Sequence, residues 1–127
     1  MKHRTLFIVG AILLLIYGLL WFVLPAVGLN LHGHDVTTTD LASVITRYWG
    51  SAYIAIAVIL WMAKEADADS IGVRAIITGG FVMLVLGLLA AINDVLYGGP
   101  NAVIWVAVAL YVIFGIWFGV LLFKKKA

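Results

Sequence analysis

Four long apolar stretches, joined by short polar segments, make up nearly the whole chain. They cover about residues 5–24, 41–62, 72–97 and 102–123. A helix of about 20 residues spans the ~30 Å hydrocarbon layer of a bilayer, and each stretch is at least that long. The pattern predicts an all-α integral membrane protein with one domain, residues 1–127, folded as an up-and-down four-helix bundle.

Polar residues and prolines mark the ends of the predicted spans. Pro25 is expected to stop the first helix, and residues 26–39 then form a mobile polar loop. Asp40, or Thr39 in its place, is a suitable N-cap for the second span. Ser70 or Asp69 can cap the third. The Gly-Gly-Pro-Asn sequence at residues 98–101 predicts a tight turn before the fourth.

The composition supports a membrane location and excludes several kinds of chemistry. Hydrophobic residues make up 65% of the chain and charged residues 11%, whereas soluble domains are about half apolar and a quarter charged. The net charge of +2 gives no indication of nucleic-acid binding, and the absence of cysteine excludes disulfides and thiolate sites. No histidine falls within a predicted span, so haem held between helices is not expected. No cofactor is predicted.

The basic residues predict the orientation. With the N-terminus in the cytoplasm, seven basic residues lie on the inner side and the outer segments contain none. This asymmetry follows the positive-inside rule and predicts a multi-pass plasma-membrane protein with both termini cytoplasmic. The seven residues are Lys2, Arg4, Lys64, Arg74, Lys124, Lys125 and Lys126.

Apart from Arg74, which stands at the inner end of the third span, two charged residues lie inside the predicted spans, Arg47 and Asp94. A charge in hydrocarbon costs at least ~2.5 kcal/mol, so such a residue indicates a functional or paired site. Helix rise puts Arg47 and Tyr17 each ~10 Å below the outer surface and Asp94 ~6 Å below it. We therefore expect one outer-facing polar site. Its candidate residues are Arg47, Asp94, Asn93, Tyr17, Trp21 and Trp49.

Small residues flank both charges at helical spacing, which is typical of helix faces that pack against other membrane helices. Both charges are thus expected to point into the bundle. The face around Arg47 is predicted to contain Ser43, Gly50, Ser51, Ile54, Ala55 and Val58, and the face around Asp94 to contain Gly80, Met83, Gly87, Ala90 and Ala91.

Three interpretations of Arg47 stay open at this point. It can form a sealed structural ion pair with Asp94, line a cavity open to the outer side, or extend its long side chain to the outer interface. Separately, His32, His34 and Asp35 are weak metal-ligand candidates in the first outer segment. A polar loop without metal is the preferred interpretation there, and we predict no metal site.

Several short sequences carry a resemblance that covers most of the chain. They are Pro25 at the end of the first span, the Arg47-Tyr48-Trp49-Gly50 sequence, the charged segment 64–74, and Asn93–Gly99 followed by Pro100. The chain resembles small prokaryotic four-span membrane proteins of unknown function that are distantly similar to DoxX-like proteins. The resemblance implies a fold and no activity, and it carries over Arg47 alone, as a structural or ligand-facing position. It includes the end of the third span, but the Asn93-Asp94 pair there is not matched to the pattern of the group.

Three functions fit these features. The first is a non-enzymatic membrane protein that binds a small or lipidic ligand, or a partner membrane protein, at Arg47 and Asp94. The second is a small transporter or channel with Asp94 as its coupling site, assembled as a homo-oligomer. The third is a cofactor-free membrane enzyme on a lipophilic substrate, with Asp94 or Tyr17 in acid–base work. Binding is preferred over catalysis.

Overall fold

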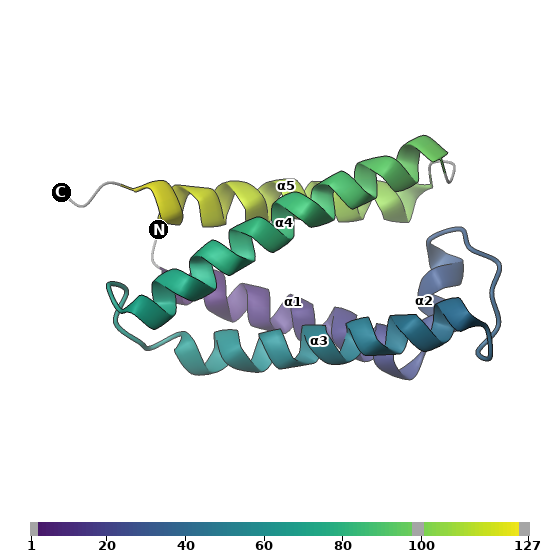
Figure 1. Ribbon diagram of the computed structural model, residues 1–127, viewed down its shortest axis with the longest axis horizontal. Helices are drawn as coiled ribbons and strands as arrows, with labels where there is room; N and C mark the ends of the chain where they lie inside the picture. The colour runs from purple at the N-terminus through teal and green to yellow at the C-terminus, as the bar shows by residue number, and fades with distance from the viewer. Residues whose placement is uncertain (1–2, 98–100, 125–127) are drawn as a thin grey trace. The chain divides into compact units, whose positions relative to one another are not determined.

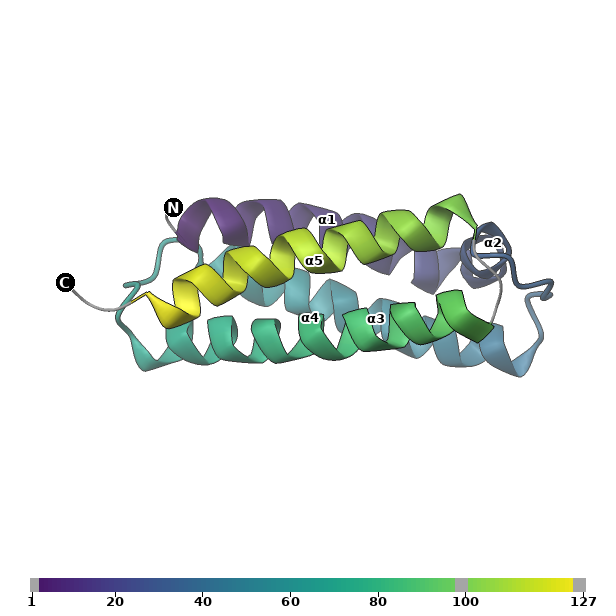
Figure 2. The same cartoon turned by 90° about the horizontal axis from the view of Figure 1, so that it is seen from above.

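The computed structural model describes residues 3–97 and 101–124, and these residues form helices and connecting segments without a strand (Figures 1 and 2). The helices are α1 (His3–Val23), α2 (Pro25–Leu31), α3 (Leu41–Ala63), α4 (Ile71–Tyr97) and α5 (Ala102–Phe123). All except α2 are long and apolar enough to cross a membrane. The all-helical prediction is confirmed, and the predicted spans match these four helices to within two residues.

Helix α2 was not predicted, because Pro25 was expected only to end a helix. Pro25 instead begins α2, where its missing N–H and its fixed φ are suited to the first helical turn. The chain bends at Leu24, yet the Gly28 N–H still donates to the Leu24 carbonyl at 3.0 Å. The prediction of a loop throughout residues 26–39 is therefore wrong for its first part.

Polar side chains precede α3, α4 and α5, and two of them accept a hydrogen bond from a backbone N–H of the first helical turn. The Ser70 Oγ accepts from the Val73 N–H at 3.3 Å, so the prediction of Ser70 as a cap is confirmed. Asn101 Oδ1 accepts from the Ile104 N–H at 3.0 Å. Asp40 precedes α3, but its carboxylate accepts from the Thr37 N–H and not from the first turn of the helix. The predicted turn at residues 98–100 and the lysines at 125 and 126 lie outside the described residues.

One compact unit, Phe7–Glu65, contains most of α1 together with α2 and α3. The backbones of α1 and α3 approach closely where Gly18 faces Gly50. A Cβ built on Gly50 would lie 2.5 Å from the Phe22 nitrogen and 2.8 Å from the Gly18 carbonyl oxygen. Only glycine leaves room for this contact, so the pair fixes how α1 and α3 pack.

The buried face of α3 repeats every seven residues, as in coiled-coil packing. It differs in part from the face predicted around Arg47. Ser43 and Gly50 are buried as expected, whereas Ser51, Ala55 and Val58 are exposed. Arg47 therefore lies at the edge of the packed face and not at its centre. The buried residues are Ser43, Thr46, Gly50, Ala57 and Leu60.

The second compact unit, Met1–Leu6 with Ala66–Ala127, contains the antiparallel helices α4 and α5, which lie side by side in Figures 1 and 2. Aromatic rings of α5 fill the space over glycines of α4. A Cβ on Gly80 or on Gly87 would come within 2.5 Å of Phe118 or Tyr111, respectively. Gly80 and Gly87 thus lie on the packed face, as predicted around Asp94. In the Gly115-x-x-x-Gly119 sequence only Gly119 packs against the partner helix, at Phe81.

We predict that Gly50→Ala destabilises the α1–α3 pair by about 1–3 kcal/mol, the usual cost of overpacking. Gly79→Ala is the matched control, because a Cβ at Gly79 meets no atom within 4 Å. The measurement is reversible unfolding in detergent, followed by circular dichroism. Equal stability of the two variants would contradict the packing described for Gly50.

Candidate functional site

Arg47 lies in the second turn of α3, level with the end of α1. The contacts Gly10 with Leu60 and Gly18 with Ile54 fix the antiparallel register of the two helices. Continued for about two more turns of α3, this register puts Arg47 opposite Val23, the last residue of α1. Tyr17 is six residues, or ~9 Å, further along α1. The sequence-based estimate of equal depth for Arg47 and Tyr17 thus differs from the register, since α3 extends beyond α1.

The Arg47 guanidinium makes no hydrogen bond or ion pair within its own unit, residues 7–65. Its side chain is half-buried. The buried hydroxyls nearby are satisfied, since Ser43 Oγ donates to the Thr37 carbonyl at 2.6 Å and Thr46 Oγ1 to the Ala42 carbonyl at 2.7 Å. Arg47 thus differs from these hydroxyls, because its guanidinium has no partner in residues 7–65.

Aromatic rings fasten α2 to the last turn of α1. The Trp21 ring lies against Gly28, where a Cβ would be 2.7 Å from Trp21 Cζ3. The Trp21 and His32 ring centroids are 5.0 Å apart, and those of Tyr17 and Trp21 are 6.5 Å apart. The candidates Tyr17 and Trp21 thus belong to one cluster that holds α2 in place at the level of Arg47.

Side-chain hydrogen bonds also hold the segment between α2 and α3. Asn30 Oδ1 accepts from the Val36 N–H at 2.9 Å, and Asn30 Nδ2 donates to the Val36 carbonyl at 3.3 Å. Ser43 joins the segment to α3 through the Thr37 carbonyl. A segment tied in this way differs from the mobile loop predicted. Asn30 and Ser43 were not recognised as positioning residues from the sequence, because their partners are backbone groups six residues away.

The weak metal candidates are not arranged as a site. The His32 Nδ1–H donates to the Gly28 carbonyl at 2.8 Å, and the His32 ring packs on Trp21. His34 is half-buried and Asp35 is exposed. Within residues 3–97 and 101–124, no three His, Asp or Glu side chains are placed to hold a metal ion.

Asp94 belongs to the other unit and lies one turn before the end of α4. It continues the seven-residue repeat of Val73, Gly80 and Gly87 along the face that α4 turns toward α5, and it is half-buried. The register of the glycine contacts puts it level with Ile104. Asn93 is exposed on α4, and Trp49 is 63% exposed on α3. The structure thus groups Tyr17, Trp21, Trp49 and Arg47 in one unit, and Asn93 and Asp94 in the other.

The chain matches no protein-family model, no curated protein and no solved structure. The resemblance to DoxX-like proteins therefore stays a prediction, and the function has to be argued from the residues themselves.

We predict that Ser43→Ala lowers the free energy of unfolding by about 1 kcal/mol, because it removes the buried hydrogen bond to the Thr37 carbonyl. Ser51→Ala is the control. Ser51 is exposed on the same helix, and its hydroxyl bonds only to the Tyr48 carbonyl one turn earlier. Denaturant unfolding in detergent compares the two. A Ser43→Ala variant as stable as Ser51→Ala would show that this bond does not hold the segment.

Proposed function

We propose that this chain is a multi-pass plasma-membrane protein that binds an anionic amphiphile at its outer end, with the ligand's carboxylate or phosphate held by Arg47. The observation that carries the proposal is the guanidinium of Arg47, which is half-buried and has no partner in its own unit. Both termini are cytoplasmic in this proposal, since the seven basic residues other than Arg47 then all lie on the inner side.

The level of Arg47 along the helices supports an amphiphilic ligand. Arg47 is level with the end of α1, a helix whose 21 residues match the thickness of the hydrocarbon layer. At that level a ligand can place its acidic group beside the guanidinium and its chain in hydrocarbon. The planar fork of arginine binds carboxylate or phosphate with two parallel hydrogen bonds. Trp21 and Trp49 provide the aromatic surface typical of this depth.

The pairing of Arg47 with Asp94 that the sequence predicts stays a prediction. The two residues belong to different compact units, and each is within about two turns of one end of its helix. Ligand binding at Arg47 is therefore proposed on the surroundings of Arg47 alone.

The direct test is binding of oleate, measured by native mass spectrometry of the purified protein. Arg47→Gln is expected to weaken oleate binding on the order of tenfold, because a charge-assisted hydrogen bond is lost. Lys64→Gln is the control, since Lys64 follows the opposite end of α3 and donates to the Trp61 carbonyl. Unchanged oleate binding in Arg47→Gln would contradict the proposal.

The ion pair itself is tested by a double-mutant cycle on stability. A pair would make Arg47→Met alone more destabilising than the double change Arg47→Met with Asp94→Leu, because removing one member of a buried pair costs more than removing both. Thermal unfolding in detergent without added lipid provides the measurement. Strictly additive effects of the two single changes would show that Arg47 and Asp94 do not pair.

A further inference from the structure

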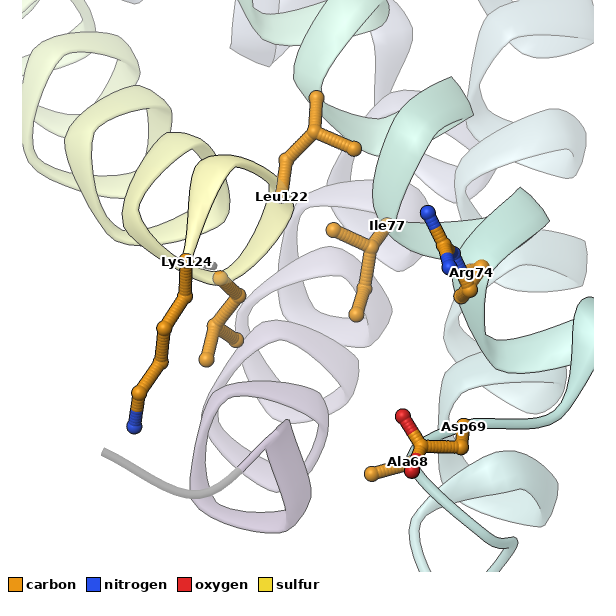
Figure 3. A pocket seen from close by; sticks show the side chains of 7 residues that line it. Ala68, Asp69, Arg74, Ile77, Leu122 and Lys124 are labelled. Atoms are coloured by element: carbon orange, nitrogen blue, oxygen red, sulfur yellow. The ribbon is translucent and has the colours of Figure 1, made fainter. Parts of the chain in front are cut away.

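A pocket of about 200 Å³ lies between the start of α4 and the end of α5, at the opposite end of the helices from Asp94. Figure 3 shows Arg74 and Lys124 on opposite sides of it, with Ile77 and Leu122 between them. All of its residues belong to the same compact unit. The remaining lining residues are Ala68, Asp69 and Leu121.

Two cations of this pocket are available for a ligand. The side chains of Arg74 and Lys124 make no hydrogen bond or ion pair with the part of the chain that the structure describes. Lys64 provides a contrast, because its ammonium donates to the Trp61 carbonyl at 3.1 Å and lies 4.1 Å from the centre of the Trp61 ring. Asp69 is the single acidic residue of the lining, so positive charge dominates the pocket.

The pocket coincides with the boundary between apolar and polar sequence. Arg74 is in the first turn of α4, and Lys124 directly follows α5. On the side of Arg74 and Lys124 that faces the middle of the helices, the lining is aliphatic, with Ile77, Leu121 and Leu122. Sites for drug-sized ligands usually measure about 300–1,000 Å³, so this volume suits a phosphate group and not a whole lipid. The acyl chains of a lipid would extend along the exposed apolar side of α5, where Ile116 is 64% exposed.

We propose that this pocket is a headgroup site for an anionic phospholipid. Arg74 would hold the phosphodiester with its fork of donors, Lys124 would add a second charge, and the aliphatic lining would meet the glycerol and the first methylenes. Basic pockets between membrane helices at the cytoplasmic surface are suited to such headgroups. The site is separate from Arg47 and uses none of its residues.

Native mass spectrometry with phosphatidylglycerol tests the proposal, with phosphatidylcholine as the neutral comparison. Arg74→Gln and Lys124→Gln are each expected to weaken phosphatidylglycerol binding by about fivefold, the effect of one basic residue at an anionic surface. Lys64→Gln removes the same charge on the same side of the membrane but outside the pocket, and it is expected to change binding by less than about twofold. Asp69→Asn is expected to strengthen binding, because it removes the one repulsive group.

Three outcomes would overturn the headgroup site. The first is that Arg74→Gln and Lys124→Gln weaken phosphatidylglycerol binding no more than Lys64→Gln does, which would mean that only general surface charge attracts the lipid. Displacement of phosphatidylglycerol by millimolar inorganic phosphate would mean that the ligand is free phosphate. Weaker binding in Asp69→Asn would mean that the acidic group takes part in holding the lipid. If Arg74→Gln fails to fold, Lys124→Gln, which lies after the last helix, carries the test alone. The loss caused by Arg74→Gln is expected to be the same in the wild type and in an Arg47→Gln background, which separates this site from the one at Arg47.

Discussion

In the proposed membrane location, the cost of holding a guanidinium beside hydrocarbon governs the end of the α1–α3 pair at which Arg47 lies. A charge at the centre of a membrane span costs at least ~2.5 kcal/mol, and the cost falls as the charge approaches the polar surface. Helix α3 extends beyond the end of α1, so Arg47 comes level with Val23 and not with the middle of the pair. Helix α2 and the hydrogen-bonded segment after it pack beside this extension. This end of the unit thus presents one guanidinium, which has no partner among its neighbours in residues 7–65.

Small residues make this arrangement feasible within each unit. In a bilayer the helices gain little from excluding water, so close van der Waals contact has to hold them together. Gly18 and Gly50 let the backbones of α1 and α3 touch, and Gly80 and Gly87 receive aromatic rings of α5. Gly50 on α3 and the two glycines of α4 each fall on a seven-residue repeat of packed positions. Such a repeat keeps one face of a helix turned toward its partner. Asp94 continues this repeat on α4, and the repeat therefore sets the direction in which its carboxylate is presented.

The sequence predicted the four long helices well, because 20 or more apolar residues bounded by polar ones leave few alternatives. It failed at α2, because a proline that ends one helix can also begin the next. The first turn of a helix needs no N–H donor from its first residue, so proline is tolerated there. It placed Arg47 at the centre of the packed face of α3, while the packed face follows Thr46, Gly50 and Ala57. Positions three and four residues apart cover a broad part of the helix surface. Only the contacts with the partner helix decide which of these positions are buried. The depth of Tyr17 was misjudged for a related reason, because the offset between α1 and α3 depends on their glycine contacts.

The central proposal is that the Arg47 guanidinium holds the acidic group of a bound amphiphile. Reversing the charge at this one position tests it most directly, with oleate binding to the purified protein as the measurement. Arg47→Glu is expected to abolish oleate binding, whereas Arg47→Lys, which keeps the charge but loses the planar fork of donors, is expected to retain part of it. Equal oleate binding in the wild type, Arg47→Lys and Arg47→Glu would contradict the account.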